Sequence, residues 1–377
     1  MRDERALRVA QAARNVGADW ALLSSPDGVA YATQHSGIIE TGPSPFAGGP
    51  NLAFVSASGD VVALVVNGLE SAAAEQSGAD RVFSYVAIAL GERSPVEDRY
   101  RIAATEAIRT LGVGGVVAVE AATLTLLVGE LLAAAGARTV LIDRELDRAR
   151  ITKTAAEIER LRACAHLTKL GQEAALVAVQ PGRSELEIWA DVRLAMEREA
   201  GERLPIAGDL TSGVASTGAI SGWPGNRIVR EQDPVLCDLG PRLRGYWGDS
   251  CNTIFVGEPG AAFKKLYTAT QQAVEVIRET LRPGITAAEF DRGVRSVFER
   301  AGVNNPLHSG HGIGTGVHEW PRIVPDQDVL LEPGMVLMLE PGAYDPDVGG
   351  VRLEWMYLVT DTGNDVLSDF AHALRPS

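Results

Sequence analysis

The 377-residue sequence predicts two domains: an α/β domain over residues 1–148, and an α+β domain over residues 149–377 with an internal pseudo-two-fold duplication. Three observations predict this organisation. Strand-like and helix-like patterns alternate through the first part of the chain, which is typical of an α/β domain. A charged run, DRELDRARITK, then opens a long amphipathic helix. Beyond it, several motifs occur twice at an offset of 102 residues.

The first domain should begin with a helix over residues 4–16. Short apolar runs predict its strands, at Trp20–Ser24, Leu52–Ser56, Val61–Val66, Val116–Val119 and Val140–Ile142. The turn residues Gly59 and Asp60 between two of these runs predict a hairpin. No cluster of residues with chemical character stands out here, so we expect this domain to shape access to a site or a dimer contact.

The duplication is seen at two kinds of position. Asp238 and Glu340 each end an apolar strand, each is followed closely by a Gly, and they lie 102 positions apart. The same offset relates two helix starts, PGRSELE at 181–187 and PGITAAE at 283–289, each with a Ser or Thr cap and a Glu three residues later. A shared offset across a helix start and a strand end indicates two copies of one helix-plus-hairpin unit.

Each copy supplies a second carboxylate on the strand that follows, Asp249 in the first and Glu354 in the second. A single Asp at a strand end is more often exposed than buried. Four carboxylates that converge from two copies are a different case, because they cannot share a dry site without cations. The sequence therefore predicts a metal site formed by Asp238, Asp249, Glu340 and Glu354.

The stretch NPLHSGHGIGTGVHEWP supplies three imidazoles, from His308, His311 and His318. A lone His is usually a packed or surface residue. Here the surrounding glycines allow close backbone approach, and neutral imidazole is the commonest metal ligand in proteins. Because this stretch lies between the two acidic hairpins in the sequence, a metal-binding role for one of its histidines is favoured.

Together these motifs resemble the superfamily of creatinase, prolidase, aminopeptidase P and methionine aminopeptidase, which has the pita-bread fold. The resemblance rests on CDLG, GHGIG with VHE, MLEPG and VRLE, and it extends over nearly the whole chain, so residues 1–148 resemble the creatinase-type N-terminal domain. It implies that Asp249 and Glu354 bridge two divalent metal ions per chain. Asp238 would complete one ion, and His311 with Glu340 the other.

The resemblance also implies catalytic roles. His318 would contact the substrate carbonyl, and Glu340 would transfer a proton. Arg352 would orient the metal ligands by contacting them, without binding an ion itself. A hydroxide held between the two ions would be the nucleophile. The oxygen-rich ligand set with one imidazole favours Mn²⁺, with Fe²⁺, Co²⁺ or Zn²⁺ as alternatives.

Two candidate substrate-binding positions depart from the peptidase pattern. Xaa-Pro peptidases of this superfamily carry a His seventeen residues before the first Asp ligand, where this chain has Ser221. His308 lies three residues before His311, where the peptidases often have a His four residues before it. Together with His318, these residues are expected to face the substrate.

The leading interpretation is a dinuclear-metal hydrolase of C–N bonds, similar to Xaa-Pro aminopeptidases and dipeptidases, that acts on a dipeptide or short peptide. Ser221 leaves a second interpretation open, a creatinase-like or ectoine-hydrolase-like enzyme that acts on a small amide or amidine. A third class, a metal-free binding protein on the same fold, is disfavoured because all five ligands are present.

The composition limits which binding partners and which cellular compartment we expect. The net charge of −14 disfavours nucleic acid and anionic membranes as partners. No apolar run reaches the length of a membrane span, and the charged N-terminus does not resemble a signal peptide. Three widely spaced cysteines predict no disulfide framework, and Cys251 is expected to be a small residue packed under the site rather than a thiolate ligand. We expect a cytoplasmic protein, and the resemblance implies a homodimer.

Overall fold

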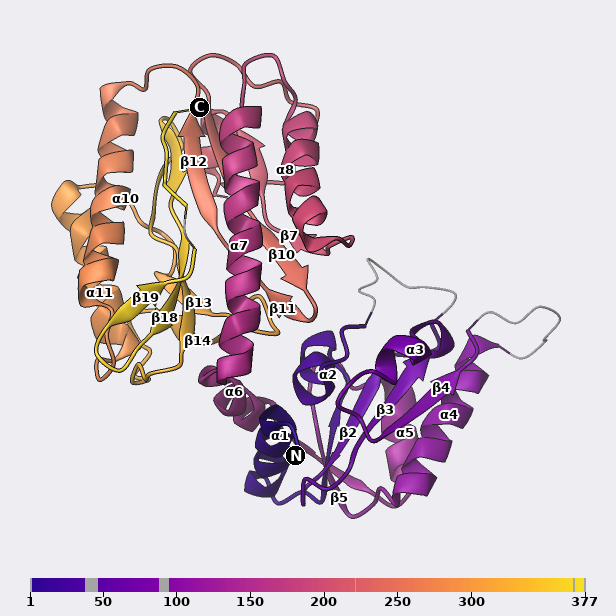
Figure 1. Ribbon diagram of the computed structural model, residues 1–377. Helices are drawn as coiled ribbons and strands as arrows, with labels where there is room; N and C mark the ends of the chain where they lie inside the picture. Colours follow the sequence, from indigo (N-terminus) through magenta and orange to yellow (C-terminus); the bar gives the residue numbers. More distant parts are fainter. Residues whose placement is uncertain (1, 38–46, 88–94, 221, 369, 376–377) are drawn as a thin grey trace. The chain divides into compact units, whose positions relative to one another are not determined.

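The computed structural model describes residues 2–37, 47–87, 95–220, 222–368 and 370–375 (Figure 1). The chain divides into two compact units, Met1–Arg150 and Ile151–Ser377. Among the helices of these described ranges, none combines the length and the apolar character needed to cross a bilayer.

The first unit is built on a six-stranded mixed sheet with the order β4-β3-β2-β1-β5-β6. Its strands are β1 (Trp20–Leu23), β2 (Leu52–Ser56), β3 (Val62–Asn67), β4 (Arg81–Tyr85), β5 (Val116–Val119) and β6 (Arg138–Leu141). Strands β2 and β3 pair antiparallel, which confirms the predicted hairpin, whereas β1 pairs with β5 and β5 with β6 in parallel.

Helices cover both faces of this sheet (Figure 1). They are α1 (Glu4–Asn15), α2 (Pro26–Thr33), η1 (Gly68–Glu70), α3 (Ser71–Ala74), α4 (Val96–Leu111), α5 (Leu126–Ala134) and α6 (Asp143–Ile151). One core joins the sheet to α1, α2 and α6, as the buried Val9, Tyr31 and Leu146 show. The other joins it to α4 and α5. The unit is therefore a three-layer α/β domain.

The sequence pattern predicted that the charged run at the boundary opens one long helix. This prediction is wrong, because the structure has two helices there. Helix α6 ends at Ile151, and α7 (Ala155–Ala178) begins after a short break. Thr154 caps α7 in a capping box, because its side chain accepts from the backbone N–H of Glu157, and the Glu157 carboxylate accepts from the backbone N–H of Thr154. This reciprocal cap starts a new helix and separates it from α6.

The second unit contains the two predicted copies, which share backbone hydrogen bonds as well as motifs. In the first copy Ser184 forms an isolated bridge with Ile228, and in the second Thr286 forms one with Leu330, 102 residues later at both positions. Ser184 caps α8 (Glu185–Ala200) and Thr286 caps α11 (Ala287–Ala301), both in capping boxes. The duplication therefore fixes how each helix start is attached to the strand region beyond it.

The strands of the second unit form small antiparallel sheets, with the orders β12-β9-β8, β11-β10-β7, β14-β13-β15-β18-β19 and β16-β17. The first copy holds β7 (Ile206–Ala207), β8 (Leu210–Ser212), β9 (Pro234–Asp238), β10 (Gly240–Leu243), β11 (Tyr246–Trp247) and β12 (Cys251–Phe255). The second holds β13 (Gly310–Gly312), β14 (Glu319–Ile323), β15 (Val336–Leu339), β16 (Gly342–Asp345), β17 (Gly349–Arg352), β18 (Trp355–Val359) and β19 (Asn364–Val366). The remaining helices are α9 (Val214–Gly218) and α10 (Ala261–Thr280).

Strands β9 and β12 pair antiparallel as predicted, but the Gly- and Arg-rich segment between them is more than a turn. It forms a second small hairpin, β10 with β11. The same arrangement recurs in the second copy, where β16 pairs with β17 between β15 and β18. The period-two pattern of the main strands hid these short strands, which contain few apolar residues.

Strand alternation decides which face carries polar groups. Val235 and Cys237 of β9 pack into the core formed with α7 and α8, whereas Leu236 contacts Cys251 and Tyr344 on the other face. Because side chains alternate along a strand, Asp238 points to the same face as Leu236. In the first copy, helices α7 and α8 thus cover one face of β9, and Asp238 lies on the opposite face.

Candidate metal centre

The two copies meet where their carboxylates lie. Asp238 is the last residue of β9 and stands directly opposite Cys251, the first residue of β12. Cys251 also forms a bridge with Glu354, whose backbone N–H donates to the Cys251 carbonyl at 2.9 Å. Strands from both copies therefore converge at Cys251, with Asp249 two residues before it.

His311, on β13, lies between two of the carboxylates. Its Nε2 is 3.7 Å from Asp249 Oδ2 and 3.5 Å from Glu340 Oε1. The opposite ring nitrogen, Nδ1, donates to the Gly312 carbonyl at 2.9 Å, so the Nε2 lone pair faces the carboxylates. Burial lowers the pKa of His311 to about 3, which keeps the imidazole neutral and able to bind a cation.

Glu340, beside His311, has an oxygen that lacks, within the described part of the chain, the partner an ordinary buried acid has. Glu340 Oε1 is buried and has no hydrogen-bond partner among the described residues. Burial raises the pKa of Glu340 to about 8, and burial followed by the neighbouring Asp238 and Glu340 charges raises the pKa of Asp249. Lone pairs of Asp249, His311 and Glu340 thus converge on one place, and this donor set fits a divalent cation.

Arg352 holds the other two predicted ligands. Its Nη2 donates to Asp238 Oδ2 at 2.5 Å, and its Nε lies 2.9 Å from Glu354 Oε1. Asp238 also lies close enough to Asp249 for its charge to raise the pKa of Asp249, which connects this cluster to the one around His311. The structure therefore brings together all five residues that the sequence analysis selected as ligands.

Cys251 lies among the candidate ligands. One ligand atom from each of Asp238, Cys251 and Glu354 falls within 4.8 Å of the others, a spacing that one metal ion could occupy. The thiol is fully buried, and burial raises its pKa well above the usual value. It is therefore a neutral thiol unless a bound cation displaces its proton.

Two of the three predicted substrate-binding residues border the centre. The exposed His318 ring has its centroid 4.4 Å from that of His311. His308 Nδ1 donates to the Gly310 carbonyl at 2.8 Å, and its Nε2 lies 3.4 Å from Glu340 Oε1. Ser221 lies outside the residues that the structure describes.

Asp209 is a candidate site residue that the sequence analysis missed. Its backbone N–H donates to the Asp238 carbonyl at 3.1 Å, and the Asp238 N–H donates to the Asp209 carbonyl at 2.8 Å. The repeat gives no signal for Asp209, because the residue paired with Glu340 in the second copy is Ser309, whose carbonyl accepts from the Glu340 N–H at 3.0 Å. Asp209 was overlooked because the surrounding stretch has the composition of a loop.

A buried ion pair supports the turn that carries His318. Lys153 Nζ lies 2.9 Å from Glu319 Oε2, and the two side chains are 1% and 4% exposed. The Glu319 carboxylate also accepts from the Gly316 N–H at 2.9 Å and from the Thr315 hydroxyl at 3.4 Å. Lys153 and Glu319 are 166 residues apart, and no local pattern pairs them.

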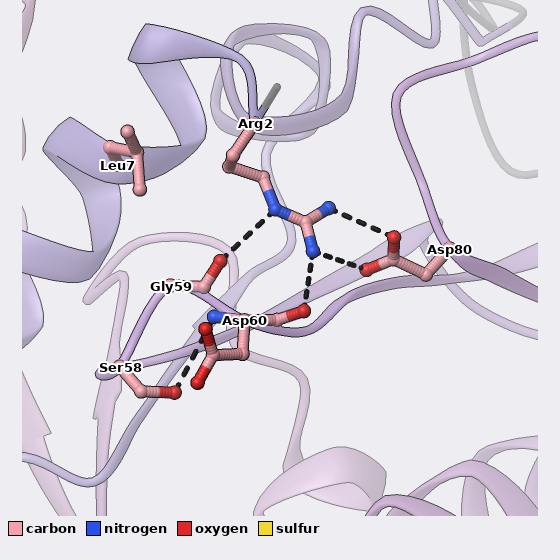
Figure 2. Close-up of a pocket in the computed structure, with 6 residues that line it drawn as sticks. All are labelled: Arg2, Leu7, Ser58, Gly59, Asp60 and Asp80. Carbon is pink, nitrogen blue, oxygen red and sulfur yellow. Dashed lines mark hydrogen bonds and ion pairs between the residues drawn. The ribbon is translucent and has the colours of Figure 1, made fainter.

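A pocket of about 420 Å³ lies in the first unit, and it contains none of the metal-centre residues (Figure 2). Arg2 crosses it, donating to the Gly59 carbonyl at 3.0 Å and pairing with Asp80 at 2.9 Å. The guanidinium also donates to the Asp60 carbonyl. These contacts tie the N-terminus to the β2–β3 turn, so we assign the pocket a structural role.

Comparison with known proteins gives matches over the second unit and over the whole fold. The model of metallopeptidase family M24 matches residues 159–361. The Xaa-Pro dipeptidase of Pyrococcus furiosus is 33% identical over 224 residues, 59% of this chain and 64% of the relative. That of Pyrococcus horikoshii is 32% identical over 229 residues, 60% of this chain and 65% of the relative. The matched part thus spans just under two thirds of these relatives.

A solved structure extends the similarity to the full chain. The prolidase from Pyrococcus horikoshii OT3 superposes with a TM-score of 0.81 at 26% sequence identity, covering 99% of this chain and 100% of that one. This match confirms the predicted fold class, a creatinase-like α/β domain followed by a duplicated pita-bread domain.

Proposed function

The chain belongs to metallopeptidase family M24, and from this membership we propose that it is a metal-dependent hydrolase of C–N bonds that cleaves Xaa-Pro dipeptides or short peptides. The observation that carries the proposal is the convergence of Asp249, His311 and Glu340 on one place, with a buried, unpartnered Glu340 oxygen. A centre built only for stability would pair that oxygen with a donor.

In this proposal Asp238, Asp249, His311, Glu340 and Glu354 would hold two divalent ions. Such a pair of ions supplies a Lewis acid for the scissile carbonyl and a water whose pKa is lowered to roughly 7. The proposal includes Mn²⁺ as the preferred ion, because the donors are mostly oxygen. It also includes a homodimer, a cytoplasmic location, and no nucleic acid or membrane partner.

The side chains around the ions have separate roles. His318 is exposed beside His311 and is placed to donate to the substrate carbonyl oxygen as charge develops there. Glu340 lies beside the reacting centre and can pass a proton from the attacking water to the leaving nitrogen. Arg352 keeps Asp238 and Glu354 oriented through its two contacts.

A second candidate function rests on one position. Ser221 stands where Xaa-Pro peptidases have a substrate-facing His. Without that imidazole, a small amide or amidine substrate, as in creatinase-like or ectoine-hydrolase-like enzymes, is the alternative.

A turnover screen separates the two candidates. The purified protein is stripped with chelator, reloaded with Mn²⁺, and offered Gly-Pro-type dipeptides, longer Xaa-Pro peptides, creatine and cyclic amidines. We expect metal-stimulated cleavage of the Xaa-Pro dipeptides. Cleavage of an amidine alone would establish the alternative. Fewer than one bound ion per chain, with no metal-stimulated turnover of any substrate, would refute both.

A further inference from the structure

We propose that Asp209 binds the cationic α-amino group of the substrate and so selects peptides with a free N-terminus. This inference rests on the peptidase function proposed above. It assigns a substrate-recognition role to a residue outside the five-ligand set.

Backbone pairing fixes the direction of the Asp209 side chain. Asp209 and Asp238 exchange both N–H···O hydrogen bonds, at 3.1 and 2.8 Å, which makes them a directly opposed antiparallel pair. Side chains of such a pair project from the same face of the sheet. Asp209 therefore lies beside Asp238, on the face where the ligands converge.

The preceding residue makes this close pairing possible. Gly208 has φ +115°, and a Cβ on it would lie 2.3 Å from the Asp238 carbonyl oxygen. Any side chain at Gly208 would therefore push the segment away from β9. The glycine holds Asp209 against Asp238.

The carboxylate of Asp209 keeps acceptor capacity for a ligand. Arg352 Nη2 is 3.7 Å from Asp209 Oδ2 but 2.5 Å from Asp238 Oδ2, so its direct hydrogen bond goes to Asp238. The Asp209 side chain is 18% exposed, which lets a ligand reach it. Its carboxylate also accepts from the backbone N–H of Gly222.

The chemistry of a peptide N-terminus suits this position. In a dipeptide the α-ammonium nitrogen is only two bonds from the scissile carbonyl carbon. If that carbonyl sits at the metal centre, the ammonium must lie next to one of the ligand side chains. Hydrogen bonds from an ammonium to a carboxylate are among the strongest in proteins.

The test compares Gly-Pro with N-acetylproline, which is Gly-Pro without its amino group. In Asp209→Asn we expect KM for Gly-Pro to rise about 10- to 100-fold, the loss expected for a hydrogen bond between charged groups. Hydrolysis of N-acetylproline and the metal content should not change. Asp191→Asn, an exposed carboxylate paired with Arg183, is the matched control and should leave both substrates unaffected.

Two outcomes would overturn the inference. An equal loss for both substrates would show that Asp209 acts through Arg352 or Asp238 instead of through the ammonium. Unchanged KM for Gly-Pro would exclude the contact altogether.

If the wild-type protein cleaves neither substrate, the proposed function fails. The role of Asp209 is then tested separately, by measuring the binding of Gly-Pro and N-acetylproline to the Mn²⁺-loaded protein by calorimetry. Preference for Gly-Pro over N-acetylproline that disappears in Asp209→Asn supports the inference. Equal affinities, or preference for creatine over both, refute it.

Discussion

Replacing Lys153 by Met should destabilise the protein strongly, because it would leave a buried carboxylate without its cation. Lys153 Nζ lies 2.9 Å from Glu319 Oε2, and both side chains are almost fully buried. Breaking a buried pair by removing one partner typically costs about 3–5 kcal/mol. Glu319 would still accept from the Gly316 N–H at 2.9 Å and the Thr315 hydroxyl at 3.4 Å. We therefore expect the lower end of that range, about 3 kcal/mol.

The assay is urea unfolding of the metal-loaded protein, with Lys153→Met compared with the Lys153→Met/Glu319→Gln double variant. Removing both charges takes away the uncompensated carboxylate, so the double variant should recover most of the loss. Arg183→Met is the control, since its pair with Asp191 is largely exposed and should contribute less than about 1 kcal/mol. A Lys153→Met variant within about 1 kcal/mol of wild type, or a double variant less stable than the single one, would refute this reasoning.

Three further predictions concern the centre itself. Asp249→Ala should bind fewer than one ion per chain by elemental analysis and lose hydrolysis, while the first unit stays folded by circular dichroism. Ser221→His should raise kcat/KM for Xaa-Pro dipeptides about tenfold, the effect of one added hydrogen bond to substrate. Chelator-stripped protein should lose stability in urea unfolding between pH 6.5 and 8, by up to about 1.4 kcal/mol per pH unit for each buried acid.

The sign of the pH effect follows from Glu340. Burial raises its pKa to about 8, from 4.5 in the unfolded chain, so the folded chain holds a proton that the unfolded chain releases. Stability present at low pH is therefore lost as the pH rises through the folded value. His311, with a pKa of about 3 when folded and 6.5 when unfolded, is half protonated in the unfolded chain at pH 6.5, so it reduces the loss near that pH and has little effect above about pH 7.5.

Each of these predictions has a contradicting result. Full turnover by Asp249→Ala would rule out the assigned centre. Unchanged cleavage of Xaa-Pro dipeptides by Ser221→His would favour a small amide or amidine as the substrate. A stability that stays flat or rises from pH 6.5 to 8 in the stripped protein would show that Glu340 is ionised there, and metal-loaded protein serves as the control that should lack the slope.

The proposed metal ligands could be selected from the sequence because each carries a local signal. Asp238 and Glu340 follow apolar runs, and a carboxylate at the end of a buried strand is conspicuous by its desolvation cost. The repeat strengthened this prediction, because Asp238 and Glu340 are separated by the same 102 residues as the two helix starts. His311 was marked by its flanking glycines, Gly310 and Gly312, which form the short strand β13 together with it.

Features that depend on distant partners could not be predicted in this way. Lys153 and Glu319 each look like ordinary surface charges, and only the fold shows that they bury one another. The break between α6 and α7 depends on a reciprocal cap at Thr154 that an amphipathic pattern does not reveal. Asp209 became visible only when its backbone pairing with Asp238 was known.

The bridge between Cys251 and Glu354 lies at the junction of the two copies, so the proposed metal centre would be formed across that junction. Neither copy alone contains a complete ligand set, since Asp238 and Asp249 come from one and His311, Glu340 and Glu354 from the other. Uptake of ions consequently reports on the docking of the two halves: a fragment holding a single copy would gain metal affinity only on mixing with its complement.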